Sequence, residues 1–368
     1  MERKKHKQML QNIAIDLILT AAALIIFALF HHVLPRPQES VGIVINNPYK
    51  TEQPADDSSL IALPEDTVYA ASLAPLSGKS NHNRNTFSSN GKGGSALTDS
   101  EVEETETEED VPLSQKFSEH YTDETVTTDS SYSSPDISIT VTQETALNGN
   151  VTYYLADIYV RDVTCFQTAL AKDTYGSGFR DSIADMAELS EALIAINGDY
   201  YGNTREGVVI RNGVIYRANP TDCDVCVLYY DGTMRVMPGS AFDMDEAIED
   251  GAWQAWTFGP ALLDQNGDTI TAFSSTSRII SSNPRTAIGY YEPGHYCMVV
   301  VDGRGESDGI SLPDLSELFY DLGCKAAYNL DGGNSSIMVW ENQIINQPSG
   351  GGRESSDAIL IKEVNSYD

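Results

Sequence analysis

The polar and apolar residues of this chain divide it into three stretches of different texture. Residues 13–30 form an apolar run in which Asp16 is the only charged residue. Residues 36–135 lack a sustained hydrophobic period and are rich in Ser, Thr, Asn, Pro, Asp and Glu. From about Ile137 onward, β-branched and aromatic residues alternate with polar ones, which is typical of half-buried strands. The pattern therefore predicts an apolar segment, a linker and one folded unit.

The folded unit, placed at residues 137–368, is expected to contain many strands and few helices. Asn-Gly and Asp-Gly pairs between apolar runs predict tight hairpins. Strands or hairpins are expected over residues 137–143, 151–160, 193–197, 208–216, 225–237, 286–291, 296–303, 325–333, 335–347 and 358–364. Helices are expected over residues 181–192, 241–251 and 311–324. We therefore expect an α+β fold, with a mixed, largely antiparallel twisted sheet core and a few packed helices.

The N-terminal segment predicts one transmembrane helix, and its flanking charges predict the topology. An apolar run of 18 residues (13–30) is just long enough to span a bilayer. The first eight residues, MERKKHKQ, carry four Lys or Arg, which favours a cytoplasmic N-terminus. No small-x-small cleavage site follows the run. We expect a cytoplasmic basic segment over 1–12, an uncleaved signal anchor over 13–34 and an extracytoplasmic C-terminal domain held at the cell membrane. A cleaved signal peptide or a buried helix is the alternative.

Residues 35–136 are predicted to form a disordered acidic linker. Residues 99–110 hold eight carboxylates in twelve positions, and such a run repels itself and buries little apolar area. The linker would hold the folded unit away from the membrane. A small hidden domain within it is the alternative.

Composition excludes several classes of function. The chain has 368 residues and a net charge of −31, which argues against nucleic acid as a partner because phosphate neutralisation needs Lys and Arg. Protein partners cannot be read from the sequence. Five cysteines are too few for a disulfide-stapled miniprotein. Cys223 and Cys226 form a C-x-x-C pair that is either a disulfide or two free thiols. A Ser-His-Asp triad would have to use His295, the one histidine of the folded unit, and we do not expect one.

Candidate chemistry gathers in polar loops that follow predicted strands. These loops are 196–202, 283–286, 302–305, 329–336 and 349–354. Arginine forks match phosphate, and successive glycines point backbone N–H groups at an anion. Carboxylates can serve as acid, base or nucleophile, and Asp and Asn oxygens leave open a Ca²⁺ or Mg²⁺ ion. The loops therefore indicate a site for an anionic, polyhydroxylated ligand.

Some of these residues have structural alternatives. Asp231 is expected to be a hairpin-turn residue, and Asp302 is either a turn residue or functional. Arg285 would either contact the ligand or pair with a structural carboxylate. Tyr200 and Tyr201 would either stack on a sugar ring or pack in the core.

Five motifs in this order resemble the phosphodiester glycosidase family. They are AINGDYYG (195–202), NPRTAIGY (283–290), VDGRG (301–305), GISLPDLSELFYDLGCKAAYNLDGGNSS (309–336) and GGGRESSDAILI (350–361). The resemblance spans about residues 137–364. It implies hydrolysis of a sugar-1-phosphodiester, which releases a free sugar and a phosphomonoester. The substrate would be a sugar-phosphate or a glycan of the cell envelope or an exopolysaccharide.

The resemblance implies roles for individual residues of these motifs, which we state as hypotheses. Asp331 would be the catalytic carboxylate that faces the sugar, with Asp199 as its partner. Arg285 and Arg304 would hold the phosphate, while Gly332 and Gly333 would supply backbone donors. The remaining predicted binding residues are Asn197, which would fix a sugar hydroxyl or orient a neighbour, Asp302, Asn334 and Ser335.

One position departs from the family pattern. The family usually reads Asp-Gly-Gly-Gly-Ser, whereas the third glycine here is Asn334. Asn tolerates positive φ better than most residues, so the turn is expected to survive. The departure nevertheless favours an alternative function, a non-catalytic glycan-binding module that serves envelope polysaccharide assembly. A purely structural surface protein is a third hypothesis.

Overall fold

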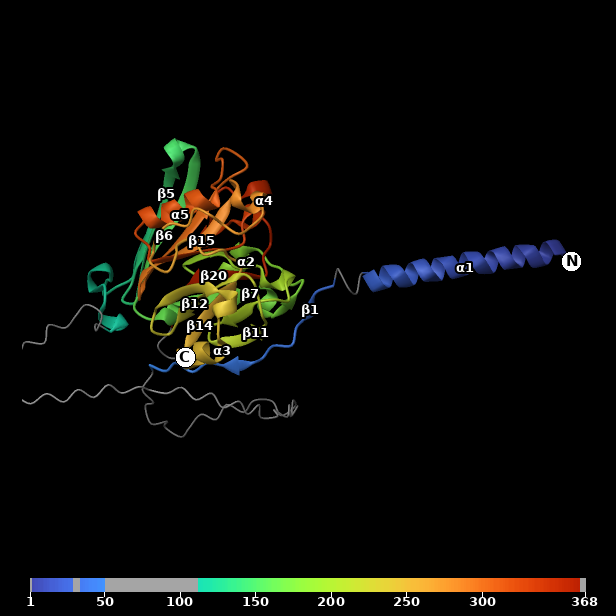
Figure 1. The fold of residues 1–368 in the computed structure, drawn as a ribbon, viewed down its shortest axis with the longest axis horizontal. Coiled ribbons are helices and arrows are strands. Elements are labelled where there is room, and N and C mark those ends of the chain that lie inside the picture. Colours follow the sequence, from blue (N-terminus) through green and yellow to red (C-terminus); the bar gives the residue numbers. More distant parts are fainter. Residues whose placement is uncertain (1, 29–33, 50–111, 365–368) are drawn as a thin grey trace, which may run out of the picture. The chain divides into compact units, whose positions relative to one another are not determined.

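The computed structural model describes residues 2–28, 34–49 and 112–364, and Figure 1 shows their ribbon. Strands in these ranges form sheets of seven, six, five and two strands. Every strand pairing recorded there is antiparallel. The predicted sheet-rich fold with few helices is confirmed, and its strands are more uniformly antiparallel than expected.

Each sheet is built largely from hairpins. The seven-stranded sheet has the order β17 (Ala326–Asn329), β15 (Arg285–Glu292), β16 (His295–Val301), β6 (Val151–Val160), β5 (Ile137–Ala146), β4 (Ser131–Ser133), β3 (Val126–Thr128). The six-stranded sheet has the order β13 (Met234–Pro238), β12 (Asp224–Tyr229), β14 (Ala252–Thr257), β10 (Val208–Arg211), β11 (Val214–Ala218), β2 (Ile43–Val44). The five-stranded sheet has the order β19 (Gln343–Ile344), β18 (Met338–Trp340), β9 (Ile194–Asn197), β20 (Asp357–Ile361), β7 (Phe166–Leu170). The small sheet pairs β1 (Arg36–Pro37) with β8 (Gly176–Ser177).

The three larger sheets share one hydrophobic core. Ile158 of β6, Ile196 of β9 and Trp256 of β14 are fully buried in the same cluster. Burial of this kind supplies the main favourable term in folding. Two strands that contribute to this core, β7 and β14, were not predicted. β7 is only five residues long, and in β14 all six residues are buried, so its polar and apolar residues do not alternate.

Short helices cover the other faces of the sheets. In Figure 1, α5 (Leu312–Asp321) lies over the seven-stranded sheet, and its Leu315 and Phe319 belong to the same buried cluster as Val299 of that sheet. Ser311 caps α5 as its Oγ accepts a hydrogen bond from the backbone N of Asp314 at 3.3 Å. The other helices of the folded unit are α2 (Ile183–Leu189) on the five-stranded sheet, α3 (Met244–Glu249) on the six-stranded sheet, and α4 (Ser277–Ile280).

The N-terminal helix α1 runs over Glu2–Ala28. Among the residues that the structure describes, none of the helices has both the length and the apolar character needed to cross a membrane. The predicted anchor over 13–34 is therefore not confirmed, and its residues 29–33 lie outside the described ranges.

The folded unit is larger than the predicted boundary of 137–368. Upstream of residue 50, β1 pairs with β8 and β2 pairs with β11, and Ile45 is buried in the core under the six-stranded sheet. Residues 112–136 contribute β3 and β4 to the seven-stranded sheet. Both ends of the predicted linker thus belong to the fold, since short strands there pair with strands of the folded unit. Residues 50–111 lie outside the described ranges.

Candidate active site

Asp331 lies at the end of a strand, on the wall of a cleft. It follows β17 directly after Leu330, and its side chain is 11% exposed. Its Oδ1 accepts a hydrogen bond from the backbone N of Gly332 at 3.0 Å, and its Oδ2 forms an ion pair with Arg353 at 2.6 Å. Burial raises the pKa of Asp331, while Ser335 and Arg353 act in the opposite direction. Asp331 is therefore a carboxyl group that is held by donors and still reaches the cleft.

Arg353 completes this arrangement, and the sequence analysis did not select it. Its Nε and Nη2 donate to the Ser335 hydroxyl at 2.9 and 2.6 Å, while Nη2 also contacts Asp331. The guanidinium lies 4.7 Å from the centre of the Tyr200 ring. An arginine directly after three glycines was the available signal, because such a loop lets the chain adopt left-handed φ, as at Gly352 with φ 90°.

Tyr200 is held between two arginines. Arg180 lies 4.8 Å from the ring centre, and its Nη1 donates to the Tyr200 hydroxyl at 2.6 Å. Tyr200 has φ 61°, an uncommon conformation for a bulky residue. Tyr201, in contrast, is fully buried and packs in the core. Of the two tyrosines, only Tyr200 lines the cleft and is placed to meet a ligand.

Asn197 orients the segment that carries Asp331. It ends β9, and its Nδ2 donates to the backbone carbonyl of Asp331 at 2.7 Å. Its Oδ1 accepts from the Thr286 hydroxyl at 2.7 Å and from the backbone N of Ile337 at 3.3 Å. Because all of Asn197 is buried, these contacts favour the predicted role of orienting a neighbour over contact with a sugar hydroxyl.

Asp199 is engaged in a buried ionic triad. Its Oδ1 pairs with Arg211 at 2.8 Å, and Arg211 also pairs with Asp357 at 2.9 Å. Its Oδ2 accepts from the backbone N of Thr257 at 2.8 Å. Burial, and then the charge of Asp199, raise the pKa of Asp357 to about 7. The contacts of Asp199 favour a role in holding the 198–201 turn, and its role as a partner of Asp331 stays a prediction.

The two arginines predicted to hold phosphate differ in what they contact. Arg285 is buried, and it donates to the backbone carbonyls of Ile310 at 3.2 Å and Ser281 at 2.8 Å. Burial, together with Arg304, lowers the pKa of Arg285 to about 10. Arg304 is exposed, and it donates to the side-chain oxygens of Asn334 at 3.1 Å and Asn283 at 2.8 Å. Arg304 is thus the more available phosphate ligand.

The backbone N–H groups of the turn after Asp331 already donate to acceptors of the protein itself. Gly332 N donates to Asp331 Oδ1, and Gly333 N donates to the carbonyl of Pro284 at 2.9 Å. The predicted supply of these two N–H groups to a phosphate therefore needs a rearrangement of the turn. Asn334 lies in the 3-10 helix Gly333–Ser335 without positive φ, so the turn does not depend on the tolerance of Asn for positive φ. Its side chain instead holds Arg304.

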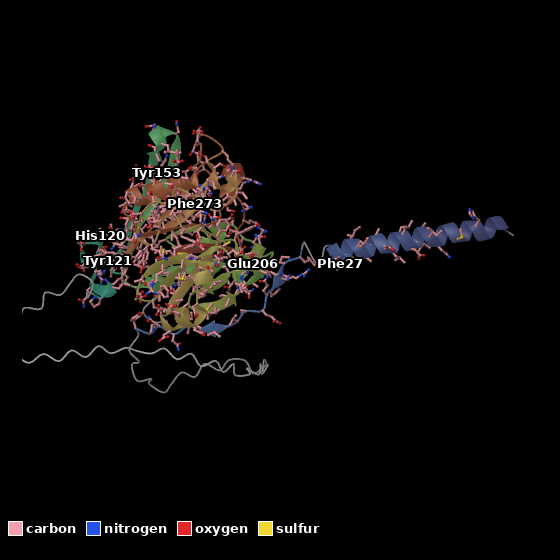
Figure 2. The ribbon with its side chains drawn as sticks, in the orientation of Figure 1. Phe27, His120, Tyr121, Tyr153, Glu206 and Phe273 are labelled. Atoms are coloured by element: carbon pink, nitrogen blue, oxygen red, sulfur yellow. The ribbon has the colours of Figure 1, made fainter. Side chains whose placement is uncertain are left out.

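A cleft of about 1130 Å³ joins these groups. Asp331, Arg353, Arg304, Asn334 and Tyr200 line it, as do Glu206 and Phe273, which are labelled in Figure 2. Exposed Cys223 also lines the cleft, whereas Cys226 is buried, and neither forms a disulfide.

Asp302 is the predicted site residue that the structure places elsewhere. It lines a separate small pocket, not the cleft. Within the described ranges, no three His, Cys, Asp or Glu side chains cluster in a way that could hold a metal ion.

Comparisons with known proteins show what a part of this chain is similar to. The model of the phosphodiester glycosidase family matches residues 190–362. The chain is 33% identical over 184 residues to the SPbeta prophage-derived protein YomE of Bacillus subtilis. It is 35% identical over 78 residues to human N-acetylglucosamine-1-phosphodiester alpha-N-acetylglucosaminidase. The resemblance predicted from the five motifs is confirmed, and residues 190–362 are similar to the phosphodiester glycosidase family.

These matches cover only part of each relative. The first spans 48% of this chain and 29% of YomE, and the second spans 21% of this chain and 15% of the human protein. The fold also matches the catalytic domain of the zebrafish N-acetylglucosamine-1-phosphodiester alpha-N-acetylglucosaminidase, with a TM-score of 0.50 and 20% identity. That match covers 62% of this chain and 83% of the zebrafish domain, and it concerns the fold alone.

Proposed function

We propose that this protein hydrolyses sugar-1-phosphodiesters in the cleft around Asp331. The observation that carries the proposal is the Asp331–Arg353–Ser335 arrangement, in which a largely buried carboxylate and a half-exposed guanidinium meet on one cleft wall. Cleavage of a glycosyl phosphate needs negative charge near the anomeric carbon and positive charge near the phosphate. This wall offers both, with Arg304 nearby as a second cation.

The groups suggest a division of labour. The Asp331 carboxylate would stabilise the positive charge that develops at the anomeric carbon as its bond to the phosphate oxygen breaks. Arg353 and Arg304 would take the growing charge of the departing phosphomonoester. Water adds to the sugar, so the products are a free sugar and a phosphomonoester. Asn197 would act as a positioning residue through the Asp331 backbone.

The names of the human and zebrafish relatives suggest the first substrate to test, an N-acetylglucosamine-1-phosphodiester. The aromatic side chains of Tyr200 and Phe273 on the cleft supply a surface suited to a sugar ring. In the proposed biological setting, the substrate belongs to an envelope or extracellular polysaccharide, and the N-terminal segment keeps the domain at the outer side of the cell membrane.

A glycan-binding module without turnover is the second candidate. Its supporting observation is that both Asp331 oxygens are already occupied, one by Gly332 N and the other by Arg353. In that case the same cleft would retain a glycan phosphate by charge and stacking.

A turnover assay with the full chain distinguishes the hydrolase from the glycan-binding module. Free sugar and phosphomonoester should be released from the methyl diester of N-acetylglucosamine 1-phosphate by the wild type, and not by Asp331→Asn. As a matched control, Asp250→Asn removes an exposed carboxylate that pairs with Arg235 at 2.8 Å outside the cleft. Saturable binding without turnover by the wild type would select the binding module instead.

A further inference from the structure

Asn334 lies between the two loops that carry the cleft arginines Arg304 and Arg353. Its Oδ1 accepts a hydrogen bond from Arg304 Nη1 at 3.1 Å. On its other side, a Cβ built on Gly350 would lie only 3.2 Å from Asn334 Nδ2, so the amide packs closely against the glycine loop that precedes Arg353. One side chain therefore contacts both loops, and a glycine at this position would offer neither contact.

Arg304 is held in one position although its side chain is exposed. Its backbone has φ 61°, in the left-handed region that is uncommon for residues other than glycine. A Cβ built on Gly333 would lie 3.3 Å from both Nη1 and Nη2, so the guanidinium rests directly on that glycine. Asn283 Oδ1 accepts from Nη2 at 2.8 Å. A guanidinium that is fixed in this way loses little conformational entropy when it binds an anion.

The acceptors that hold Arg304 are neutral. Both are amide oxygens, whereas Arg353 pairs with the Asp331 carboxylate at 2.6 Å. A neutral acceptor orients a guanidinium without cancelling its charge, while a carboxylate also cancels the charge. Arg285 adds a second positive charge nearby, and among the ion pairs recorded for the described residues neither Arg285 nor Arg304 has a carboxylate partner. The charge of Arg304 is therefore available to an anion.

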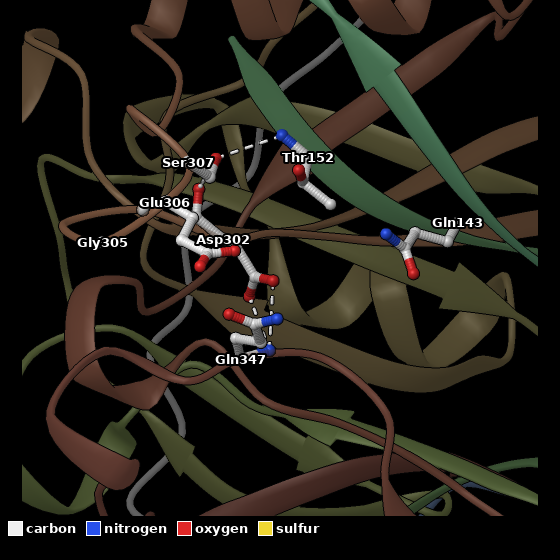
Figure 3. A pocket seen from close by; sticks show the side chains of 8 residues that line it. Gln143, Thr152, Asp302, Gly305, Glu306, Ser307 and Gln347 are labelled. Atoms are coloured by element: carbon white, nitrogen blue, oxygen red, sulfur yellow. Dashed lines mark hydrogen bonds between the residues drawn. The ribbon is translucent and has the colours of Figure 1, made fainter. Parts of the chain in front are cut away.

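The loop that carries Arg304 is also anchored at Asp302, in the small pocket that is separate from the cleft. Figure 3 shows Asp302 bonded to Gln347, whose backbone N donates to both carboxylate oxygens at 3.0 Å. Gln347 belongs to the segment that leads to Arg353. Asp302 thus joins the two arginine loops in the pocket, while Asn334 joins them in the cleft. Two contacts in different places therefore fix the loops relative to each other.

We propose that Asn334 is a positioning residue that makes the two arginine loops one preformed phosphate clamp, because its neutral amide holds Arg304 beside Arg353 without reducing the charge of Arg304. The inference rests on the proposed function and deepens it. Asn334 acts through Arg304. The departure from the third glycine of the family pattern thus strengthens phosphate binding in this chain and is not a sign of lost activity.

The first test measures kcat/KM of the full chain for the methyl diester of N-acetylglucosamine 1-phosphate. Asn334→Ala removes the amide and should lower kcat/KM about fivefold. Asn334→Asp keeps the shape and the acceptor but offsets the charge of Arg304, so it should lower kcat/KM further, by about 20-fold. In an Arg304→Gln background, Asn334→Ala should cause no additional loss. Asn266→Ala, in an exposed turn outside the cleft, is the matched control and should leave kcat/KM unchanged.

Binding of inorganic phosphate to the same proteins, measured by calorimetry, tests the clamp apart from the chemistry. Thermal melts check that each variant is folded. The dissociation constant should rise about fivefold in Asn334→Ala and further in Asn334→Asp. If these shifts are seen but the wild type cleaves no diester, the proposed function fails and the clamp stands. The proposal is overturned if the wild type binds no phosphate, if Asn334→Asp binds no more weakly than Asn334→Ala, or if the loss in Asn334→Ala persists in the Arg304→Gln background.

Discussion

Two Asp–Arg systems in this molecule use the same chemical groups in opposite settings. In the cleft, Asp331 pairs with Arg353, whose side chain is 42% exposed and follows three glycines. In the interior, Arg211 of β10 pairs with Asp199 and Asp357, and all three side chains are at most 1% exposed. A buried pair loses hydration and is retained only because its partners compensate, whereas a half-exposed pair can exchange a partner for a ligand. Exposure of the arginine is therefore the difference between the pair that can meet a ligand in the cleft and the pair that is enclosed in the interior.

The largest expected effect on activity comes from removing the Asp331 carboxylate from its ion pair with Arg353. Asp331→Asn keeps the shape and removes the charge, so kcat/KM for a sugar-1-phosphodiester should fall about 10³-fold. Because the Asp331–Arg353 pair is partly solvated, the free energy of unfolding should change by only about 1 kcal/mol. Initial rates and thermal melts measured on one preparation check both values. A large loss of stability with activity retained per folded molecule would reverse the assignment.

Breaking the buried triad of Asp199, Arg211 and Asp357 should lower stability and leave activity per folded molecule unchanged. Arg211→Met leaves two carboxylates buried without a cation, so the free energy of unfolding should fall by about 3–5 kcal/mol. Urea titration measures this loss. The kcat of the fraction that stays folded should remain near the wild-type value, since Arg211 contacts no residue of the Asp331–Arg353–Ser335 arrangement among its recorded bonds. A proportionate loss of kcat in the folded fraction would argue that the triad takes part in catalysis.

The geometry of the cleft arginine can be tested at constant charge. Arg353→Lys should lower kcat/KM by about 10-fold or more, because one ammonium cannot reproduce the planar fork that meets Asp331, Ser335 and the Tyr200 ring. Arg235→Lys is the matched control, since Arg235 pairs with Asp250 and lies 4.6 Å from the Tyr229 ring outside the cleft. Steady-state kinetics of both variants should show a loss for Arg353→Lys alone, and equal losses would mean that the planar fork is not what matters.

The last prediction concerns how the free energy of unfolding depends on pH through the buried Asp357. The pKa of Asp357 is raised to about 7 in the folded protein from a usual value of 3.8. The folded state therefore binds this proton more tightly than the unfolded state, and the free energy of unfolding falls as the pH rises from about 4 to about 7. Asp357→Asn should flatten this part of the stability curve. Urea titrations at pH 5 and pH 8 check the sign, and a steeper curve in the variant would contradict it.

The sequence predicts the hairpins and helix α5 well because their signals are local. Ser311, the turn pairs and the alternating strands each act over a few residues, and the structure places these elements close to the expected bounds. It does not predict β14, and it assigns β2 to the linker. Strand β2 gains its partner only through a contact with β11 that is remote in sequence, and the Trp-rich β14 does not alternate.

The sequence predicts where the candidate site lies better than it predicts the contacts that its residues make. Asp331 follows from its position after a short apolar strand. Arg353, 22 residues further on, becomes its partner only through the fold. Arg285 belongs to one of the five motifs, but its guanidinium donates to the backbone carbonyls of Ile310 and Ser281. The sequence does not predict these contacts, because they depend on which loops the fold brings next to Arg285. Asp302 shares a motif with Arg304 and still faces a different pocket, since neighbouring residues of one loop point to opposite sides.

The most direct test of the central claim is the pH dependence of phosphomonoester release by the full-chain wild type and Arg353→Gln. Arg353 lowers the pKa of the Asp331 carboxyl against the effect of burial. If Asp331 acts as a carboxylate in the cleft, the acid limb of kcat/KM should move to higher pH when Arg353 is removed. An acid limb at the same pH in both proteins, with turnover retained, would show that Asp331 is not the group on which the reaction depends.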